Sequence, residues 1–134
     1  MFLPCQALIV STDRLHCVKI EEIAAGLGMQ SVHCASLTDA RTRIAVQSFP
    51  LVLCGDDLPD CNVRTALHVL TPSTGDLPVI VLSHLADWDA YMRALGAGAF
   101  DYIAGPADPI ETERILRLAL ALNSPRADTS RGAA

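Results

Sequence analysis

Five short apolar runs alternate with stretches of helical periodicity along this chain of 134 residues, and that alternation constrains its fold more than any other feature. The runs cover residues 7–10, 32–35, 51–54, 79–82 and 100–103. Their apolarity is continuous, which is typical of strands buried on both faces of a parallel sheet. The sequence therefore predicts an α/β fold, a three-layer (βα)5 sandwich with right-handed crossovers and the parallel strand order 2-1-3-4-5.

Apolar residues recur at i, i+3, i+4 and i+7 in most of the stretches between the runs, as in amphipathic helices. The sets expected to face the core are Ile20, Ile23, Ala24 and Leu27; Val63, Ala66, Leu67 and Leu70; Trp88, Tyr91, Met92 and Leu95; and Ile115, Leu118, Ala119 and Leu122. A weaker pattern at residues 38–48 places Ala40 and Ile44 inward. Asp87 and Asp108 are predicted N-caps, and the glycine pairs at 26/28 and 96/98 are predicted helix ends.

The composition indicates one domain over residues 1–123, which is large enough to bury a core. Residues 124–134 are small and polar, and we expect a disordered tail or a linker there. No run is apolar enough to span a bilayer and no signal peptide is evident, so we expect a cytoplasmic protein that does not bind membranes. The net charge of −5 argues against direct nucleic-acid binding.

The five cysteines and four histidines show no spacing typical of a metal site. The cysteines are interpreted as small buried hydrophobes in a reducing compartment. Cys54 could also be a redox-sensitive thiol, but core packing is the favoured interpretation. No metal or cofactor is predicted.

In a sheet of this order, ligands gather at the carboxyl ends of the strands, where the strand order reverses. The residues that this interpretation places there are Ser11, Thr12, Asp13, Gly55, Ser83 and Gly105. They form the candidate site without reference to any known protein.

Two loops carry a resemblance to a known family. Residues 51–60 (LVLCGDDLPD) indicate a buried strand that enters a polar loop, and residues 101–106 (DYIAGP) indicate a strand that ends at a Gly-Pro turn. With residues 78–83 (PVIVLS) and 97–102 (AGAFDY), they resemble the receiver domain of response regulators, a CheY-like, flavodoxin-like fold. The resemblance runs from about residue 7 to residue 122 and implies a role in bacterial two-component signal transduction, or phosphorelay. It also implies a cis bond between Gly105 and Pro106.

The residues that carry receiver chemistry are replaced here. Adjacent acidic residues that hold magnesium in receivers fall on Ser11 and Thr12, the phospho-acceptor aspartate on Gly55, and the lysine on Gly105. Ser83 and Tyr102 match the family pattern. Glycine cannot form an acyl phosphate, and neutral hydroxyls are poor ligands for Mg²⁺. The sequence therefore predicts a degenerate pseudo-receiver that neither binds Mg²⁺ nor acts as an enzyme.

Several alternatives remain open at this point. Asp56 or Asp57 could accept a phosphoryl group instead, although the Leu58-Pro59 anchor argues against the required change of register. Asp13 is interpreted as a helix N-cap rather than a metal ligand. A Ser83–His84 dyad is not favoured, because adjacent side chains at a strand end diverge. A small molecule could also occupy a neutral pocket, formed by Ser11, Thr12, Gly55, Ser83 and Gly105.

Receivers commonly bind partners through the face formed by their fourth helix, fifth strand and fifth helix. The residues that the resemblance places there are Trp88, Tyr91, Ile110, Arg114 and Arg117. Aromatic and arginine side chains are frequent hot spots of protein interfaces. We therefore expect a module that contacts a protein partner or a second copy of itself.

Overall fold

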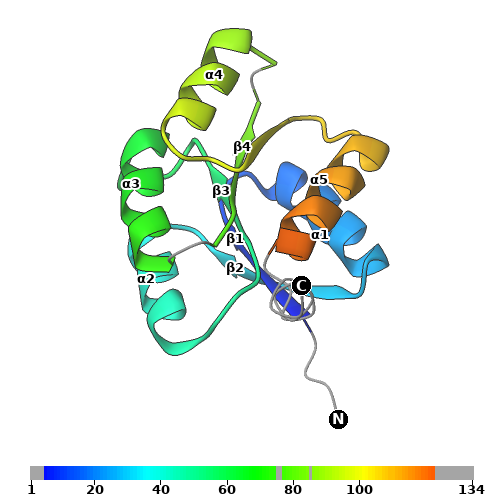
Figure 1. The fold of residues 1–134 in the computed structure, drawn as a ribbon, viewed down its shortest axis with the longest axis horizontal. Coiled ribbons are helices and arrows are strands. Elements are labelled where there is room, and N and C mark those ends of the chain that lie inside the picture. The colour runs from blue at the N-terminus through cyan, green and yellow to red at the C-terminus, as the bar shows by residue number, and fades with distance from the viewer. Residues whose placement is uncertain (1–4, 75–76, 85, 123–134) are drawn as a thin grey trace, which may run out of the picture.

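The computed structural model describes residues 5–74, 77–84 and 86–122 (Figure 1). Strands and helices alternate along the chain as β1 (Cys5–Val10), α1 (Arg14–Gly26), β2 (Met29–Cys34), α2 (Leu37–Val46), β3 (Val52–Gly55), α3 (Val63–Thr74), β4 (Val79–Ser83), α4 (Trp88–Gly96), β5 (Asp101–Ala104) and α5 (Pro109–Leu122). The tail predicted at residues 124–134 lies outside the described residues. No helix in the described part of the chain is both long and apolar enough to cross a membrane.

All strand pairs of the sheet are parallel, and the order is β2-β1-β3-β4-β5. The predicted fold class and strand order are therefore confirmed. Figure 1 shows α1 and α5 on one side of the sheet and α2, α3 and α4 on the other. Because every strand runs the same way, the ends of β1, β3, β4 and β5 meet at one edge, called the carboxyl edge below.

Two apolar clusters hold the layers together, one on each face of the sheet. Successive side chains of a strand point to opposite faces, so Val52 and Cys54 join the cluster under α2 and α3, whereas Leu53 joins the cluster under α1 and α5. Ile20 of α1 and Ile115 of α5 complete the second cluster. Burial of each such side chain contributes roughly 1.5–3 kcal/mol, which favours this layered arrangement over an open chain.

The helix ends follow the predicted capping signals. Asp13 accepts a hydrogen bond from the backbone N–H of His16, Asp87 from Asp89, and Asp108 from Glu111. Gly28 and Gly98 follow α1 and α4 with φ of +84° and +110°. Side chains other than glycine rarely adopt this conformation, so these two positions end the helices cleanly.

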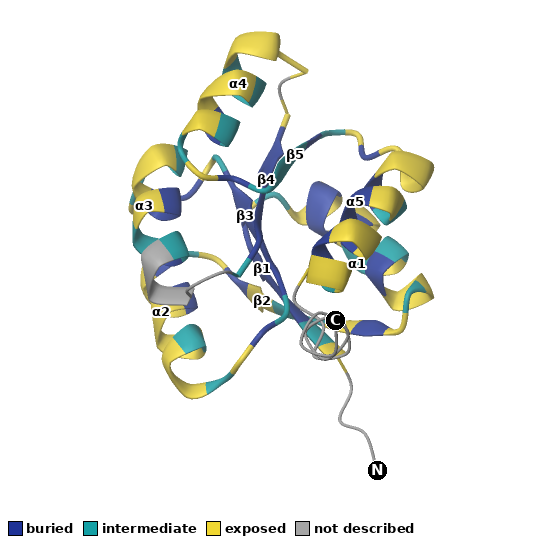
Figure 2. Cartoon of the chain, viewed as in Figure 1, coloured by how far each residue is buried: buried dark blue, intermediate teal, exposed yellow. Residues whose placement is uncertain are grey.

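The predicted inward face of α4 is wrong in part. Trp88 and Met92 are 70% and 49% exposed, Tyr91 and Leu95 are half-buried, and Ala94 is the residue of this helix that joins the core. Figure 2 shows α4 at one end of the molecule, with exposed surface along most of its length. The periodicity identified an apolar face, but α4 lies against β5, the edge strand of the sheet, and much of that face stays exposed.

The predicted inward face of α5 also needs correction. Leu118 and Leu122 are 47% and 59% exposed, whereas Leu116 is fully buried beside Ile115 and Ala119. The helix carries enough apolar residues between positions 115 and 122 to form two overlapping stripes. Packing against α1 selects one of them, and the sequence pattern alone does not.

The cysteines do not share one environment. Cys17, Cys34 and Cys54 are buried as predicted, but Cys5 is exposed at the start of β1 and Cys61 is half-buried. Burial raises the pKa of Cys54 to about 12, so its thiol stays protonated and unreactive at neutral pH. This favours core packing over the redox alternative for Cys54.

Candidate functional site

The carboxyl edge brings together the residues that the strand order predicted. The N–H of Gly105 donates to the carbonyl of Ser83 at 2.7 Å, and the N–H of Asp56 donates to Leu82 at 3.0 Å. Ser11 continues β1 and donates its N–H to Cys34 at 2.9 Å. The Gly105–Pro106 bond is cis, as predicted. The backbone frame of the predicted site is therefore present.

The position of Gly55 is crowded by neighbouring polar atoms. A Cβ atom on Gly55 would lie 2.6 Å from Oδ1 of Asp57 and 2.9 Å from Oγ of Ser11. Non-bonded atoms do not approach so closely, so no other side chain fits without movement of its neighbours. Thr12 Oγ1 donates a hydrogen bond to Asp57 Oδ2 at 2.8 Å. The loops after β1 and β3 are therefore bridged above Gly55, and the carboxylate of Asp57 takes up that space.

Ser11 and Asp13 bond locally rather than forming a set of free ligands. The hydroxyl of Ser11, which is 1% exposed, accepts the N–H of Asp13 at 3.0 Å, and its carbonyl oxygen lies 2.8 Å from Nε2 of His33. Asp13 caps α1, as predicted. Within the described residues no group of three or more histidine, cysteine, aspartate or glutamate side chains is arranged to hold a metal ion.

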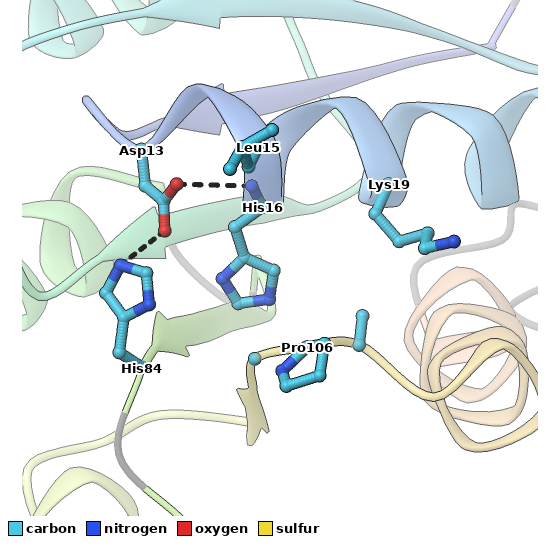
Figure 3. A pocket seen from close by; sticks show the side chains of 8 residues that line it. Asp13, Leu15, His16, Lys19, His84 and Pro106 are labelled. Atoms are coloured by element: carbon cyan, nitrogen blue, oxygen red, sulfur yellow. Dashed lines mark hydrogen bonds and ion pairs between the residues drawn. The ribbon is translucent and has the colours of Figure 1, made fainter.

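One contact at this edge was not anticipated from the sequence. Nε2 of His84 lies 2.5 Å from Oδ2 of Asp13, with His84 68% and Asp13 15% exposed (Figure 3). His84 was considered only as a possible partner of Ser83, and its ring instead contacts the end of α1. Its place directly after β4, across the site from Asp13, was the available signal.

His16 is the second residue that sequence reasoning missed. Its side chain is 7% exposed, and its ring would lie 3.4 Å from a Cβ atom on Gly105. The ring centroid is 6.3 Å from that of His84. Burial lowers the pKa of His16, and the nearby Asp13 carboxylate partly opposes that effect. An imidazole that is neutral at neutral pH thus lies beside Gly105, at the end of β5.

The cavity beside the site differs in its lining from the neutral pocket that the sequence suggested. Asp57 fills the space over Gly55, and of the five only Gly105 lines the cavity beside the site. That cavity, of about 430 Å³, is formed instead by Asp13, Leu15, His16, Lys19, His84, Gly105, Pro106 and Ala107 (Figure 3). The carboxyl edge and the cavity therefore adjoin but are different places.

The second predicted surface is the α4–β5–α5 face, defined here by Trp88, Tyr91, Ile110, Arg114 and Arg117. The ring of Tyr91 lies 5.3 Å from Trp88 and 5.9 Å, edge to face, from Tyr102 of β5. Ile110 at the start of α5 is 82% exposed. Offset and edge-to-face contacts hold aromatic rings in place, so Tyr91 and Tyr102 support an exposed Trp88.

The two arginines of the α4–β5–α5 face are exposed and paired within their helix. Arg114 forms two hydrogen bonds to Glu111, of 2.9 and 2.6 Å, and Arg117 contacts Glu113 at 3.0 Å. The pKa of Arg114 is raised, chiefly by Glu111, with smaller contributions from Asp101 and Tyr91. Asp101 lies on β5 and Tyr91 on α4, so both neighbouring elements contribute to the electrostatic environment of Arg114.

Comparison with known proteins gives a consistent result at low identity. No family model matches the chain. The transcriptional regulatory protein ZraR of Salmonella typhimurium is 26% identical over 114 residues, which are 85% of this chain and 26% of ZraR. The response regulator protein PilR of Pseudomonas aeruginosa is 27% identical over 124 residues, which are 92% of this chain and 28% of PilR. The chain spans about a quarter of the length of these curated relatives.

Solved structures agree with these relatives. A putative response regulator from Chloroflexus aurantiacus superposes with a TM-score of 0.81 at 28% identity, over 89% of this chain and 99% of that one. The beryllofluoride-activated NtrC4 receiver domain dimer has a TM-score of 0.80 at 18% identity, over 89% and 98% of the two chains, and supports the fold alone.

The strand order and the site at the carboxyl edge define a flavodoxin-like α/β domain. Together with the loop sequences and the relatives, they support a CheY-like receiver domain of the response-regulator type.

Proposed function

We propose that this receiver domain works without phosphorylation, as a protein-interaction or dimerisation module of a cytoplasmic signalling pathway. The observation that carries the proposal is the carboxyl edge, where Gly55 takes the acceptor position and the Asp57 carboxylate occupies the adjoining space. A phosphoryl group needs an acceptor, a metal and a balancing cation. Gly55, the Ser11-Thr12 pair and Gly105 replace the residues that supply these in receivers.

The α4–β5–α5 face supports the proposed role in protein interaction or dimerisation. Trp88 and Ile110 are 70% and 82% exposed beside two arginines, a combination of residue types that is enriched at the centres of interfaces. The partner is a protein or a second copy of the chain. The module has no catalytic activity of its own, requires no cofactor, and does not contact nucleic acid or membranes directly.

Mass spectrometry tests the statement that the domain is not phosphorylated. Incubation with acetyl phosphate and Mg²⁺ should leave the intact mass unchanged, because Gly55 offers no carboxylate to phosphorylate. A receiver that retains its acceptor aspartate serves as the positive control. A hydroxylamine-labile phosphoryl adduct on Asp56 or Asp57 would contradict the proposal.

A second candidate function is phosphorylation of Asp57 itself. The observation that favours it is the 2.6 Å between Asp57 Oδ1 and the Cβ position of Gly55, which puts a carboxylate near the family's acceptor site. Against it, Thr12 holds the other carboxylate oxygen, and the lysine position is Gly105. The same mass measurement on an Asp57→Asn variant distinguishes this candidate from modification at Asp56.

Charge reversal tests the statement that the α4–β5–α5 face binds a partner or a second copy of the chain. Replacing Arg114 and Arg117 together by Glu should weaken self-association or partner binding, because reversed charges oppose docking and each new carboxylate faces Glu111 or Glu113. The matched control is Arg41→Glu with Arg43→Glu on α2, which makes the same charge change on exposed residues far from β5. Light scattering and pull-down of both variants decide the matter. Equal loss in both would mean that net charge, and not this face, governs association.

A further inference from the structure

The cavity beside the carboxyl edge has the size and the polar groups of a small-ligand site. Its volume of about 430 Å³ lies within the range of roughly 300–1,000 Å³ that is usual for such sites. It opens between the first turns of α1, the end of β4 and the loop from β5 to α5 (Figure 3). Ser11, Thr12 and Gly55 do not line it, so it is separate from the place where a receiver carries its phosphoryl group.

A buried polar atom without a partner supplies a second, independent observation. His16 lines the cavity with a side chain that is only 7% exposed, and within the described residues its Nε2 has no hydrogen-bond partner. Buried polar groups in proteins are nearly always satisfied, and one left unpaired costs free energy. A ligand that binds against this ring could satisfy the imidazole after a small adjustment of its orientation.

The charges that line the cavity favour an anion. Asp13 is the only carboxylate among the lining residues, and it is paired with His84. Lys19, the only lysine of the chain, lies at one end of the cavity and forms none of the ion pairs found within the described residues. Asp13 therefore already has a contact partner in His84, whereas the Lys19 ammonium has no ion-pair partner among the described residues and can receive an anionic ligand.

The other lining residues indicate what the anion is attached to. Leu15 and Pro106 are exposed apolar residues on opposite sides of the cavity (Figure 3), and Ala107, which is buried, also lines it. Proline has no backbone N–H, and no glycine-rich loop offers the several donors that a phosphate group needs. A planar carboxylate with an apolar body matches one cation and an apolar wall better than a phosphate does.

We propose that this cavity binds a small organic carboxylate, with its anionic group at the Lys19 and histidine side and its apolar part between Leu15, Pro106 and Ala107. Gly105 makes room for it. A Cβ atom at this position would lie 3.4 Å from the His16 ring, so even a methyl group would narrow the cavity there. Gly105, which stands where the resemblance places the lysine of receivers, thus also leaves room for the ligand.

The test is a titration of the ¹⁵N-labelled chain, followed by ¹H–¹⁵N correlation spectra. The probes are benzoate, its neutral analogue benzamide and its cationic analogue benzylamine, which share a ring but differ in charge. We expect benzoate to produce saturable shifts at residues 13–19 and 104–107, and the other two probes to bind more weakly. Absence of saturable benzoate binding, or shifts centred on the α4–β5–α5 face, would overturn the proposal.

Two variants and a matched control locate the site. Gly105→Ala should weaken benzoate binding about tenfold or more, which is the scale of one methyl group that clashes in a pocket. Gly26→Ala is the control, because a Cβ atom there meets nothing within 4 Å. Lys19→Met should weaken benzoate a few-fold, up to about fivefold, and leave benzamide unchanged, as expected for an exposed charge contact.

The remaining outcomes are equally decisive. Unchanged benzoate affinity in Gly105→Ala would place the site elsewhere, and unchanged affinity in Lys19→Met, or equal binding of benzamide, would remove the assignment to an anion. The test is independent of phosphorylation and of association, so its failure leaves the proposed interaction role untouched.

Discussion

At the carboxyl edge of the sheet, polar side chains contact one another, whereas on the α4–β5–α5 face large apolar side chains lie in solvent. Asp57 bonds to Thr12 over Gly55, and Asp13 pairs with His84. On the α4–β5–α5 face, Trp88 and Ile110 are mostly exposed. The difference teaches that several polar groups at the carboxyl edge are held by contacts with one another, while the α4–β5–α5 face keeps large apolar surface in contact with water, which is unfavourable.

The largest effect on stability is expected from a substitution at Gly55, at the carboxyl edge. Gly55→Asp introduces a carboxylate whose side chain would meet Asp57 Oδ1 and the buried hydroxyl of Ser11. We expect the free energy of unfolding to fall by about 1–3 kcal/mol, as for other overpacked sites. Urea denaturation followed by circular dichroism measures it.

The control for this substitution is Gly55→Asp combined with Asp57→Ala. Removing the Asp57 carboxylate should restore part of the lost stability, since it relieves the shortest contact and one like charge, while the contact with Ser11 remains. If Gly55→Asp were as stable as the parent, the carboxyl edge would be open rather than closed.

A substitution in the other region, Trp88→Ala on the α4–β5–α5 face, should have the opposite effect. Because Trp88 is 70% exposed, its loss should change the free energy of unfolding by no more than about 0.5 kcal/mol. Association should nevertheless weaken about tenfold or more, the effect typical of an aromatic hot spot. Analytical ultracentrifugation and denaturation of the same variant separate the two quantities. A variant that loses stability but keeps its association would reverse the roles assigned to the two regions.

Much of the fold could be predicted from the sequence, because its signals are local and repeated. Continuous apolar runs specified the strands, and Asp13, Asp87 and Asp108 specified where three helices begin. The faces of α4 and α5 were less predictable. Leu116 and Leu118 are equally apolar, and packing of α5 against the sheet and α1 determines which of them is buried.

The site was predictable in its backbone and less so in its side chains. Strand order alone brings Ser11, Gly55, Ser83 and Gly105 together. The position of the Asp57 carboxylate over Gly55 depends on the conformation of the loop after β3. His16 becomes a candidate site residue only once α1 is packed against the loop after β5. Contacts between loops far apart in sequence carry no periodic signal, so the Asp13–His84 pair was missed.

A smaller effect is expected in the pH dependence of the free energy of unfolding, which reports on the carboxyl edge through His16. The pKa of His16 is lowered from its ordinary value of 6.5, chiefly by burial, while Asp13, Asp56 and Asp57 oppose that shift and His84 adds to it. Below pH 6.5 the unfolded chain takes up a proton that the folded chain resists, so the free energy of unfolding should fall as pH decreases from there towards the folded pKa.

The measurement is denaturation at several values between pH 7.5 and pH 5, compared with a His16→Gln variant. The variant should show a flatter dependence in this window. The lowered pKa values of Asp60 and Glu111 affect stability only below their ordinary values of 3.8 and 4.5, where protonation removes a favourable interaction. An unchanged slope in His16→Gln would show that the buried imidazole does not set the pH response.

The smallest expected effect concerns the bridge that closes the carboxyl edge. Thr12 is exposed, so Thr12→Val should lose only the hydrogen bond to Asp57 and cost about 0.5–1 kcal/mol of unfolding free energy. Asp57→Ala removes the other partner, and the double variant completes a cycle. Because the two side chains contact each other, the effects should not add, and the coupling energy should be about 0.5 kcal/mol. Additive effects would mean that Thr12 and Asp57 do not hold each other in solution. The space over Gly55 would then be open to other groups, and side-chain contacts would no longer distinguish the carboxyl edge from the α4–β5–α5 face.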